Sequence, residues 1–248
     1  MFSSSEFLQV LVSACKTVPA DVIAKHSIKK EELFFRDLVL GHLAETRSDL
    51  SFKKEWRLSE DALKRWEHTR PKDKKKSGRI DLVALRKTEG LPGAPCLGVE
   101  FKYWYWFDAL NESKYSDQIK VGHSILLSFL TDATKLVAEI PPNAGTSIIV
   151  TVIPTIHFDE IPRHSQTYRG EFVVERGFPS SYIGRRSGIN QSEQPLSVAE
   201  LRTSALNQIS GFFRDRNYPT VVGGELTGSF ESLKLTTDFV VSEVFVKH

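Results

Sequence analysis

The sequence predicts an α/β fold, in which helices flank a mixed central β-sheet. Three observations support this prediction. Apolar residues recur at helical spacing before and after a group of strand-like segments. Two of those segments, 78–85 and 96–104, are joined by a stretch with two Gly and two Pro, which is typical of a turn. The run 147–154, SIIVTVIP, is continuously apolar and β-branched, as expected of a central strand.

The amino-acid composition limits the classes of protein to which this chain can belong. A chain of 248 residues with 40% hydrophobic and 26% charged residues is typical of a globular protein, and we expect a single domain over residues 1–248. The net charge of +2 excludes a generally cationic, histone-like protein but leaves room for a local basic patch. Two cysteines are too few for a disulfide framework or a four-cysteine zinc site, so we expect free thiols and a cytoplasmic location.

The N-terminal third combines helices with one strand. Phe7, Leu11, Ala14 and Val18 lie on one face of an expected helix, and the absence of a basic start argues against a signal peptide. A second helix is expected over 28–46, with Ser27 as its N-cap. Residues 51–58 alternate as in a strand, residues 59–68 suit a short helix, and residues 70–78 form a basic loop.

The C-terminal half contains two more expected helices. The first covers about 116–138, and its expected buried stripe comprises Ile119, Gly122, Leu126, Leu130, Ala133 and Val137. The second covers 197–214, and weak alternation over 221–246 predicts further strands. Residues 155–196 are rich in loops. No apolar run is long enough for a membrane span, so we expect no membrane partner.

The charged residues that interrupt the apolar strands are the best functional candidates. Alternate side chains of a strand share a face, and an antiparallel pairing of 78–85 with 96–104 can bring Asp81 beside Glu100 and Lys102. Burying such charges is costly unless they are paired or bind a metal. The alternative is an exposed outer face on which they are solvated. Glu55 is either an additional carboxylate or an ion-pair partner of Lys53 or Arg57.

These residues carry a family resemblance. Ile80-Asp81, followed after eighteen residues by Glu100-Phe101-Lys102, resembles the signature of the PD-(D/E)XK nuclease superfamily, and so does the wider string from Gly78 to Leu82. Ile80 stands where the name-giving proline would be. The resemblance covers about residues 28–154 and implies the restriction-endonuclease-like fold. It also implies an acidic residue on the preceding helix, a role that Glu31 or Glu32 could fill.

The resemblance further implies Mg²⁺-dependent hydrolysis of phosphodiester bonds, with Mn²⁺ as a substitute. Asp81, Glu100 and the carbonyl oxygen of Phe101 would supply the hard oxygen ligands that Mg²⁺ prefers. Lys102 would position a water molecule and offset negative charge in the transition state. Glu31 or Glu32 would hold an outer-shell water or a second ion. We therefore expect an endonuclease that acts on DNA, in the manner of a restriction or defence nuclease.

A nuclease also needs a positive surface for phosphate. Lys72, Lys74, Lys75, Lys76 and Arg79 lead directly into the Asp81 strand and are the candidate DNA contacts, although such a run can equally be a solvated loop. A homodimer would suit double-strand cutting, because two-fold symmetry matches the duplex. Two other readings stay open: a non-catalytic nucleic-acid-binding or structural protein of the same fold, and a nuclease that acts on RNA.

Overall fold

A computed structural model gives the three-dimensional arrangement of most of the chain. It describes residues 2–28, 31–69, 78–87, 93–104, 123–157, 198–230 and 233–245. The expected lysine contacts at 72–76, the loop-rich region 158–196 and the first part of the helix expected at 116–138 lie outside these residues. Arg79 is the one candidate DNA contact that the structure describes, and it is exposed at the start of its strand.

Six strands form one sheet in the order β1-β2-β3-β4-β6-β5. Their bounds are Leu50–Arg57 for β1, Arg79–Arg86 for β2, Pro95–Tyr103 for β3, Thr146–His157 for β4, Thr220–Phe230 for β5 and Leu233–Val244 for β6. The pairing of β3 with β4 is parallel, and the other pairings are antiparallel. The expected mixed sheet is thus confirmed, and so is the antiparallel pair that carries Asp81 and Glu100.

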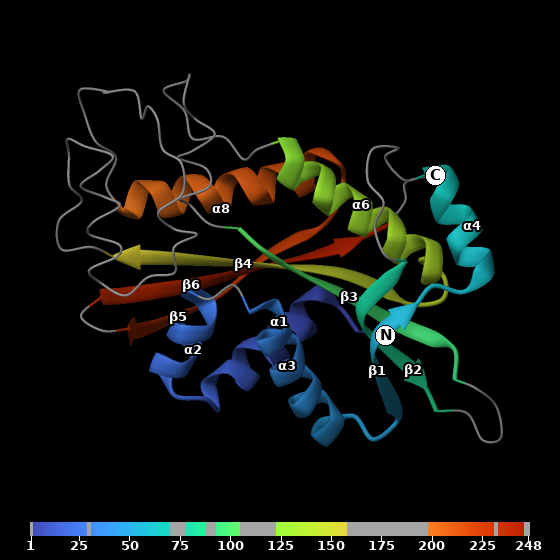
Figure 1. Cartoon of the computed structure of the whole chain (residues 1–248), viewed down its shortest axis with the longest axis horizontal. Helices are drawn as coiled ribbons and strands as arrows, with labels where there is room; N and C mark the ends of the chain where they lie inside the picture. The colour runs from blue at the N-terminus through green and yellow to red at the C-terminus, as the bar shows by residue number, and fades with distance from the viewer. Residues whose placement is uncertain are drawn as a thin grey trace.

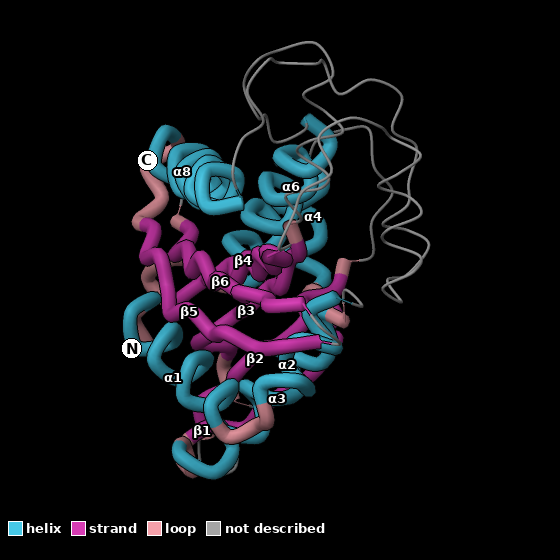
Figure 2. Tube along the Cα trace, turned by 90° about the vertical axis from the view of Figure 1, so that its left-hand side faces the viewer, coloured by secondary structure: helices cyan, strands magenta, loops and turns pink. Residues whose placement is uncertain are grey.

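Helices cover both faces of the sheet (Figures 1 and 2). On one face lie α1 (Ser4–Lys16), α2 (Ala20–Ile28) and α3 (Glu32–Thr46); on the other lie α4 (Glu60–Thr69), α6 (His123–Glu139) and α8 (Val198–Asp215). No single helix in the described ranges is long and apolar enough to cross a membrane. Helices α1 and α2 reach that length and apolarity only when counted together, and they meet at 113°.

The alternation of β3 decides which side chains meet which layer. Leu97, Val99 and Phe101 are buried in the apolar cluster that the sheet shares with α1 and α3. Gly98 points the other way, because a Cβ atom there would lie 2.6 Å from Cδ1 of Ile140, just beyond the end of α6. Glu100 and Lys102 have the same parity as Gly98 and therefore face α6.

Two expectations about the helices need correction. Ser27 is not an N-cap: it lies inside α2, and its buried hydroxyl bonds to that of Thr237, while Glu31 occupies the N-cap position of α3 without a side-chain cap. The buried stripe of α6 is also rotated from the expected one. The buried apolar residues of this helix include Phe129, Ala133 and Leu136. Two charged residues, Asp132 and Lys135, are buried with them. Leu130 and Val137 are only partly buried.

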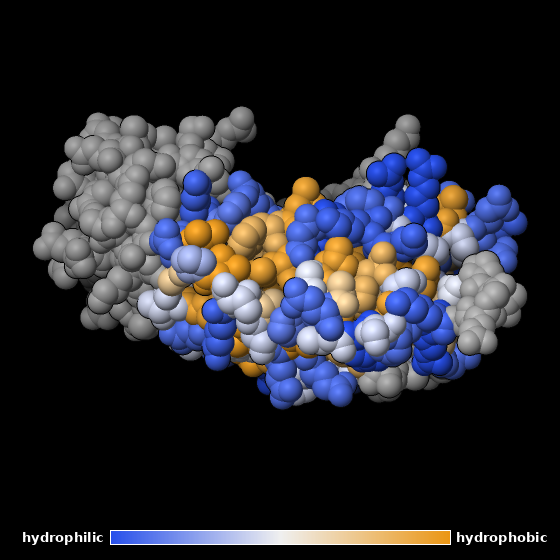
Figure 3. Space-filling model, turned by 90° about the horizontal axis from the view of Figure 1, so that it is seen from below, coloured by the Kyte–Doolittle hydropathy of each residue, from blue (hydrophilic) through white to orange (hydrophobic). Residues whose placement is uncertain are grey.

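The α1–α3 face mixes polar and apolar side chains on its surface (Figure 3). Of the large apolar side chains in the described ranges, Leu33 on α3, Leu63 on α4 and Val222 on β5 are markedly exposed. Leu33 directly follows Glu32 on α3, so it lies next to the site described below.

Candidate active site

The site begins where two neighbouring strands separate. The ladder between β2 and β3 ends at the pair Leu82–Val99, whereas β2 continues to pair with β1 as far as Arg79. Beyond this point the edge of β3 that faces β2 no longer has a strand beside it in register. Backbone N–H groups on that edge need other partners, since a buried backbone donor is costly to leave unsatisfied.

Asp81 supplies the first of these partners. Its Oδ2 atom accepts a hydrogen bond of 2.8 Å from the backbone N–H of Phe101. The N–H and C=O groups of one residue in a strand point to the same side, so the Phe101 carbonyl also points toward β2. The structure thereby brings the Asp81 carboxylate beside the Phe101 backbone.

Glu32 supplies the second partner from a different layer. Its carboxylate lies beside the backbone N–H of Tyr103, two residues further along the same edge of β3. Burial raises the pKa of Glu32; the positive charge of Lys102 opposes this rise, and the carboxylates of Asp81 and Asp132 add to it. Glu32 is thus electrostatically part of the same site as Asp81 and Lys102.

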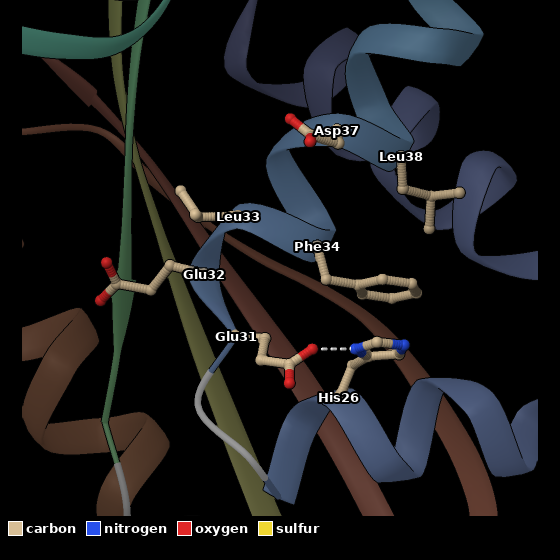
Figure 4. A pocket seen from close by; sticks show the side chains of 7 residues that line it. All are labelled: His26, Glu31, Glu32, Leu33, Phe34, Asp37 and Leu38. Carbon is tan, nitrogen blue, oxygen red and sulfur yellow. Dashed lines mark hydrogen bonds and ion pairs between the residues drawn. The ribbon is translucent and has the colours of Figure 1, made fainter.

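The two glutamates at the start of α3 point in different directions (Figure 4). Glu31 contacts Nδ1 of His26 on α2, and the His26 ring stacks on Phe34 at a centroid distance of 3.9 Å. Glu32 points away from this pair, toward β3. Of the two candidates that the sequence left open, the structure brings Glu32 beside β3 and pairs Glu31 with His26, and both glutamates line a cavity of about 680 Å³.

Glu100 lies deeper and is only 2% exposed. Its Oε1 atom is 2.6 Å from Nζ of Lys135 on α6, and that ammonium is also 3.1 Å from Oδ1 of Asp132. Burial raises the pKa of Glu100 well above its ordinary value, and the positive charge of Lys135 only partly opposes this rise. The apolar pattern of the sequence gives no indication that Lys135 is buried beside Glu100.

Lys102 is held by the other oxygen of Asp132. Its Nζ atom is 2.8 Å from Oδ2 of Asp132, whose side chain is 2% exposed. Burial disfavours the charged ammonium, but the carboxylates of Asp132 and Glu100 outweigh this effect and raise the pKa of Lys102. Asp132 therefore bridges two ammonium groups, one from the sheet and one from its own helix.

We call these six side chains the charged cluster: Glu32, Asp81, Glu100, Lys102, Asp132 and Lys135. When every member is ionised, four negative charges face two positive charges. The imbalance of carboxylates suits a divalent cation, and Asp81, Glu100 and the Phe101 carbonyl are the hard oxygen donors that Mg²⁺ prefers. No three His, Cys, Asp or Glu side chains of the described residues converge at metal-binding distance.

Glu55 has a structural partner. It lies in β1 between Lys54, which pairs with Leu82, and Trp56, which pairs with Ile80, so it is level with Asp81. Its backbone adopts a left-handed φ of 49°, and its carboxylate accepts a 2.7 Å hydrogen bond from Arg36 on α3. The ion pair that the sequence suggested with Lys53 or Arg57 is replaced by this one.

The sequence contains an indication of Asp132 and Lys135, although the periodicity of apolar residues alone does not identify them. They are three residues apart, so they share one side of a helix. The helix follows the strand that carries Glu100 and Lys102, and a crossover helix packs back onto such a strand. Matching the charges of the strand face with opposite charges on that helix would have found both residues.

The comparisons with known proteins add no family. No family model, no curated protein and no solved structure matches the chain.

Proposed function

We propose that this chain is a Mg²⁺-dependent endonuclease of the PD-(D/E)XK type that hydrolyses phosphodiester bonds in DNA. The observation that carries the proposal is the meeting of Asp81 and Glu32, from two separate layers, at the N–H groups of Phe101 and Tyr103 on one edge of β3, beside Glu100 and Lys102. A structural ion pair needs no such gathering of carboxylates around one end of a strand, whereas a metal site does.

Each residue has a role that follows from its position. Asp81, Glu100 and the Phe101 carbonyl would hold the ion, which when bound acts as a Lewis acid and lowers the pKa of a coordinated water. Lys102, kept charged by Asp132 at 2.8 Å, would place a positive charge beside the phosphate that is being attacked. Glu32 would orient water from the α3 side of the strand. The basic run that enters β2 at Arg79 would hold the DNA backbone.

One observation favours a second candidate function. The ammonium of Lys135 already lies 2.6 Å from Glu100 and neutralises it without a metal. A protein that uses this fold only to bind nucleic acid could keep its charged cluster in this state permanently. This alternative predicts DNA binding without cleavage.

Cleavage of a supercoiled plasmid tests the proposal. With Mg²⁺ the wild-type chain should nick or linearise the plasmid, and a chelator should stop the reaction. Asp81→Asn, Glu100→Gln and Glu32→Gln should each lower the cleavage rate by at least about a hundredfold, because loss of several kcal/mol of transition-state stabilisation costs tenfold for each 1.4 kcal/mol.

Glu31→Gln is the matched control. It removes the same charge from the neighbouring position of α3, but its side chain faces His26 rather than β3. We expect this variant to cleave at close to the wild-type rate. Cleavage by the wild-type chain that persists in chelator, or equal losses in Glu31→Gln and Glu32→Gln, would contradict the assignment. DNA binding without any cleavage would favour the second candidate.

A further inference from the structure

Lys135 lies within contact distance of two buried carboxylates. Its Nζ atom is 2.6 Å from Oε1 of Glu100 and 3.1 Å from Oδ1 of Asp132, and its side chain is 5% exposed. Lysine side chains are rarely buried to this extent unless a negative charge requires them. The position of Lys135 is thus fixed by the charged cluster and not by solvent.

The contact with Glu100 conflicts with metal binding. Glu100 is the deepest of the proposed metal ligands, and an ammonium at 2.6 Å already supplies its counter-charge. A divalent cation on the same carboxylate would meet a positive charge in a region of low dielectric, where like charges repel strongly. Lys135 has a second partner on its own helix, Asp132, that it can keep when it leaves Glu100.

We propose that Lys135 takes the place of the divalent cation in the metal-free protein, and that metal binding displaces it from Glu100 while it stays paired with Asp132. This inference rests on the proposed function, because it needs Glu100 to be a metal ligand. The exchange requires a change in one side chain only, since both carboxylates already lie within reach of the same ammonium.

The exchange would let the chain fold around an otherwise repulsive site. Without Lys135, the buried Glu100 would face Asp81 and Asp132 with only Lys102 to offset three negative charges. Breaking a buried pair of this kind is strongly destabilising. With Lys135 in place, the site is stable before metal arrives, and the metal affinity is lower than the carboxylates alone would give.

Calorimetric titration with Mn²⁺ tests the proposal directly. The measurements use the full chain at about pH 8 and compare the wild type with Lys135→Met and Lys102→Met. The two variants remove the same charge from the same cluster, but only Lys135→Met frees Glu100, since Lys102 pairs with Asp132. We expect Lys135→Met to bind Mn²⁺ on the order of tenfold more tightly than the wild type. The increase in Mn²⁺ affinity of Lys102→Met should be severalfold smaller than that of Lys135→Met.

The outcomes separate this inference from the proposed function. Equal gains in both variants would show an effect of net charge alone and would overturn the exchange. Unchanged or weaker binding by Lys135→Met would overturn it too, because Lys135 would then support metal binding. If neither the wild type nor the Lys135→Met variant binds Mn²⁺, the metal requirement in the proposed function fails as well.

A crystal structure of the wild-type chain with Ca²⁺ gives a second measurement that needs no variant. The proposal expects Nζ of Lys135 to lie beyond hydrogen-bond distance of Glu100 while it remains within salt-bridge distance of Asp132. Retention of the Lys135–Glu100 contact beside a bound ion would overturn the proposal, even if Lys135→Met does not fold.

Discussion

Asp132 should be the most costly single charge to remove from the charged cluster. Its two oxygens face the ammonium groups of Lys102 at 2.8 Å and Lys135 at 3.1 Å, and its side chain is 2% exposed. Asp132→Asn preserves the shape of the side chain and removes the charge. The ammonium groups of Lys102 and Lys135 then lose this shared counter-charge, and Lys135 keeps only its contact with Glu100.

The magnitude follows from burial. Removing one partner of a buried ion pair costs about 3–5 kcal/mol, and the amide oxygen of Asn can still accept one hydrogen bond, so we expect the lower end, about 3 kcal/mol. For a chain of this size each kcal/mol lowers the melting temperature by about 2–4 °C, which gives a decrease of about 6–12 °C. Urea denaturation followed by tryptophan fluorescence can measure the free energy, because Trp66 and Trp104 are fully buried.

Asp37→Asn is a control that also removes a carboxylate shared by two cations, but at an exposed position, and there both cations contact the same oxygen, Oδ1. Asp37 also bridges two cations, with Nε of Arg36 at 2.9 Å and Nζ of Lys54 at 3.1 Å, but its side chain is 46% exposed. Solvent screening should hold its cost below about 1 kcal/mol. Equal free energies of unfolding for the two variants would refute the argument, because burial would then have no effect on the value of the bridge.

Two other predictions concern packing and thiol chemistry. Gly145→Ala should destabilise the chain by more than about 3 kcal/mol in a thermal melt, because its Cβ atom would lie 2.4 Å from the backbone oxygen of Cys96. The Cβ atom of Gly41→Ala in α3 meets no atom within 4 Å, so this variant should be about 0.5–1 kcal/mol more stable than the wild type. A Gly145→Ala variant as stable as the wild type would contradict the first expectation. In the native protein at about pH 8, Cys96 should react with a disulfide reagent faster than Cys15, because burial raises the pKa of Cys15 to about 12, and Cys96 is less buried. Loss of the fast phase in Cys96→Ser is the expected control result, and its persistence would show that Cys15 is the accessible thiol.

The strands and their charged residues could be predicted from the sequence because their patterns are local. Alternation placed Asp81, Glu100 and Lys102 on the right strands, and the run 147–154 was correctly expected in the centre of the sheet. The choice between Glu31 and Glu32 could not be predicted, since the two are adjacent in the chain and only the position at which α3 begins decides that Glu31 is the N-cap residue and Glu32 the first residue of the helix. The pairing of Glu55 with Arg36 depends on a left-handed backbone conformation at Glu55, and the sequence pattern there does not predict that conformation.

The phase of α6 was missed for a different physical reason. Periodicity arguments assume that buried helix positions are apolar. In α6 two of the buried positions carry Asp132 and Lys135, and the sheet beneath supplies their opposite charges. The hydrophobic pattern therefore identified the helix correctly but rotated its buried face away from the site.

The position of the charged cluster along the chain also bears on the order in which the molecule folds and on which parts of the sequence can change. Apart from Glu32, the charged cluster lies between Asp81 and Lys135, in one hairpin and the helix that follows it. The ion pairs of this part need no residue beyond Lys135, so they can form before β5, β6 and α8 join the sheet. None of the described residues of those three elements belongs to the cluster. Sequence change in the C-terminal half can thus remodel the outer surface of the protein and leave the chemistry of the hairpin as it was.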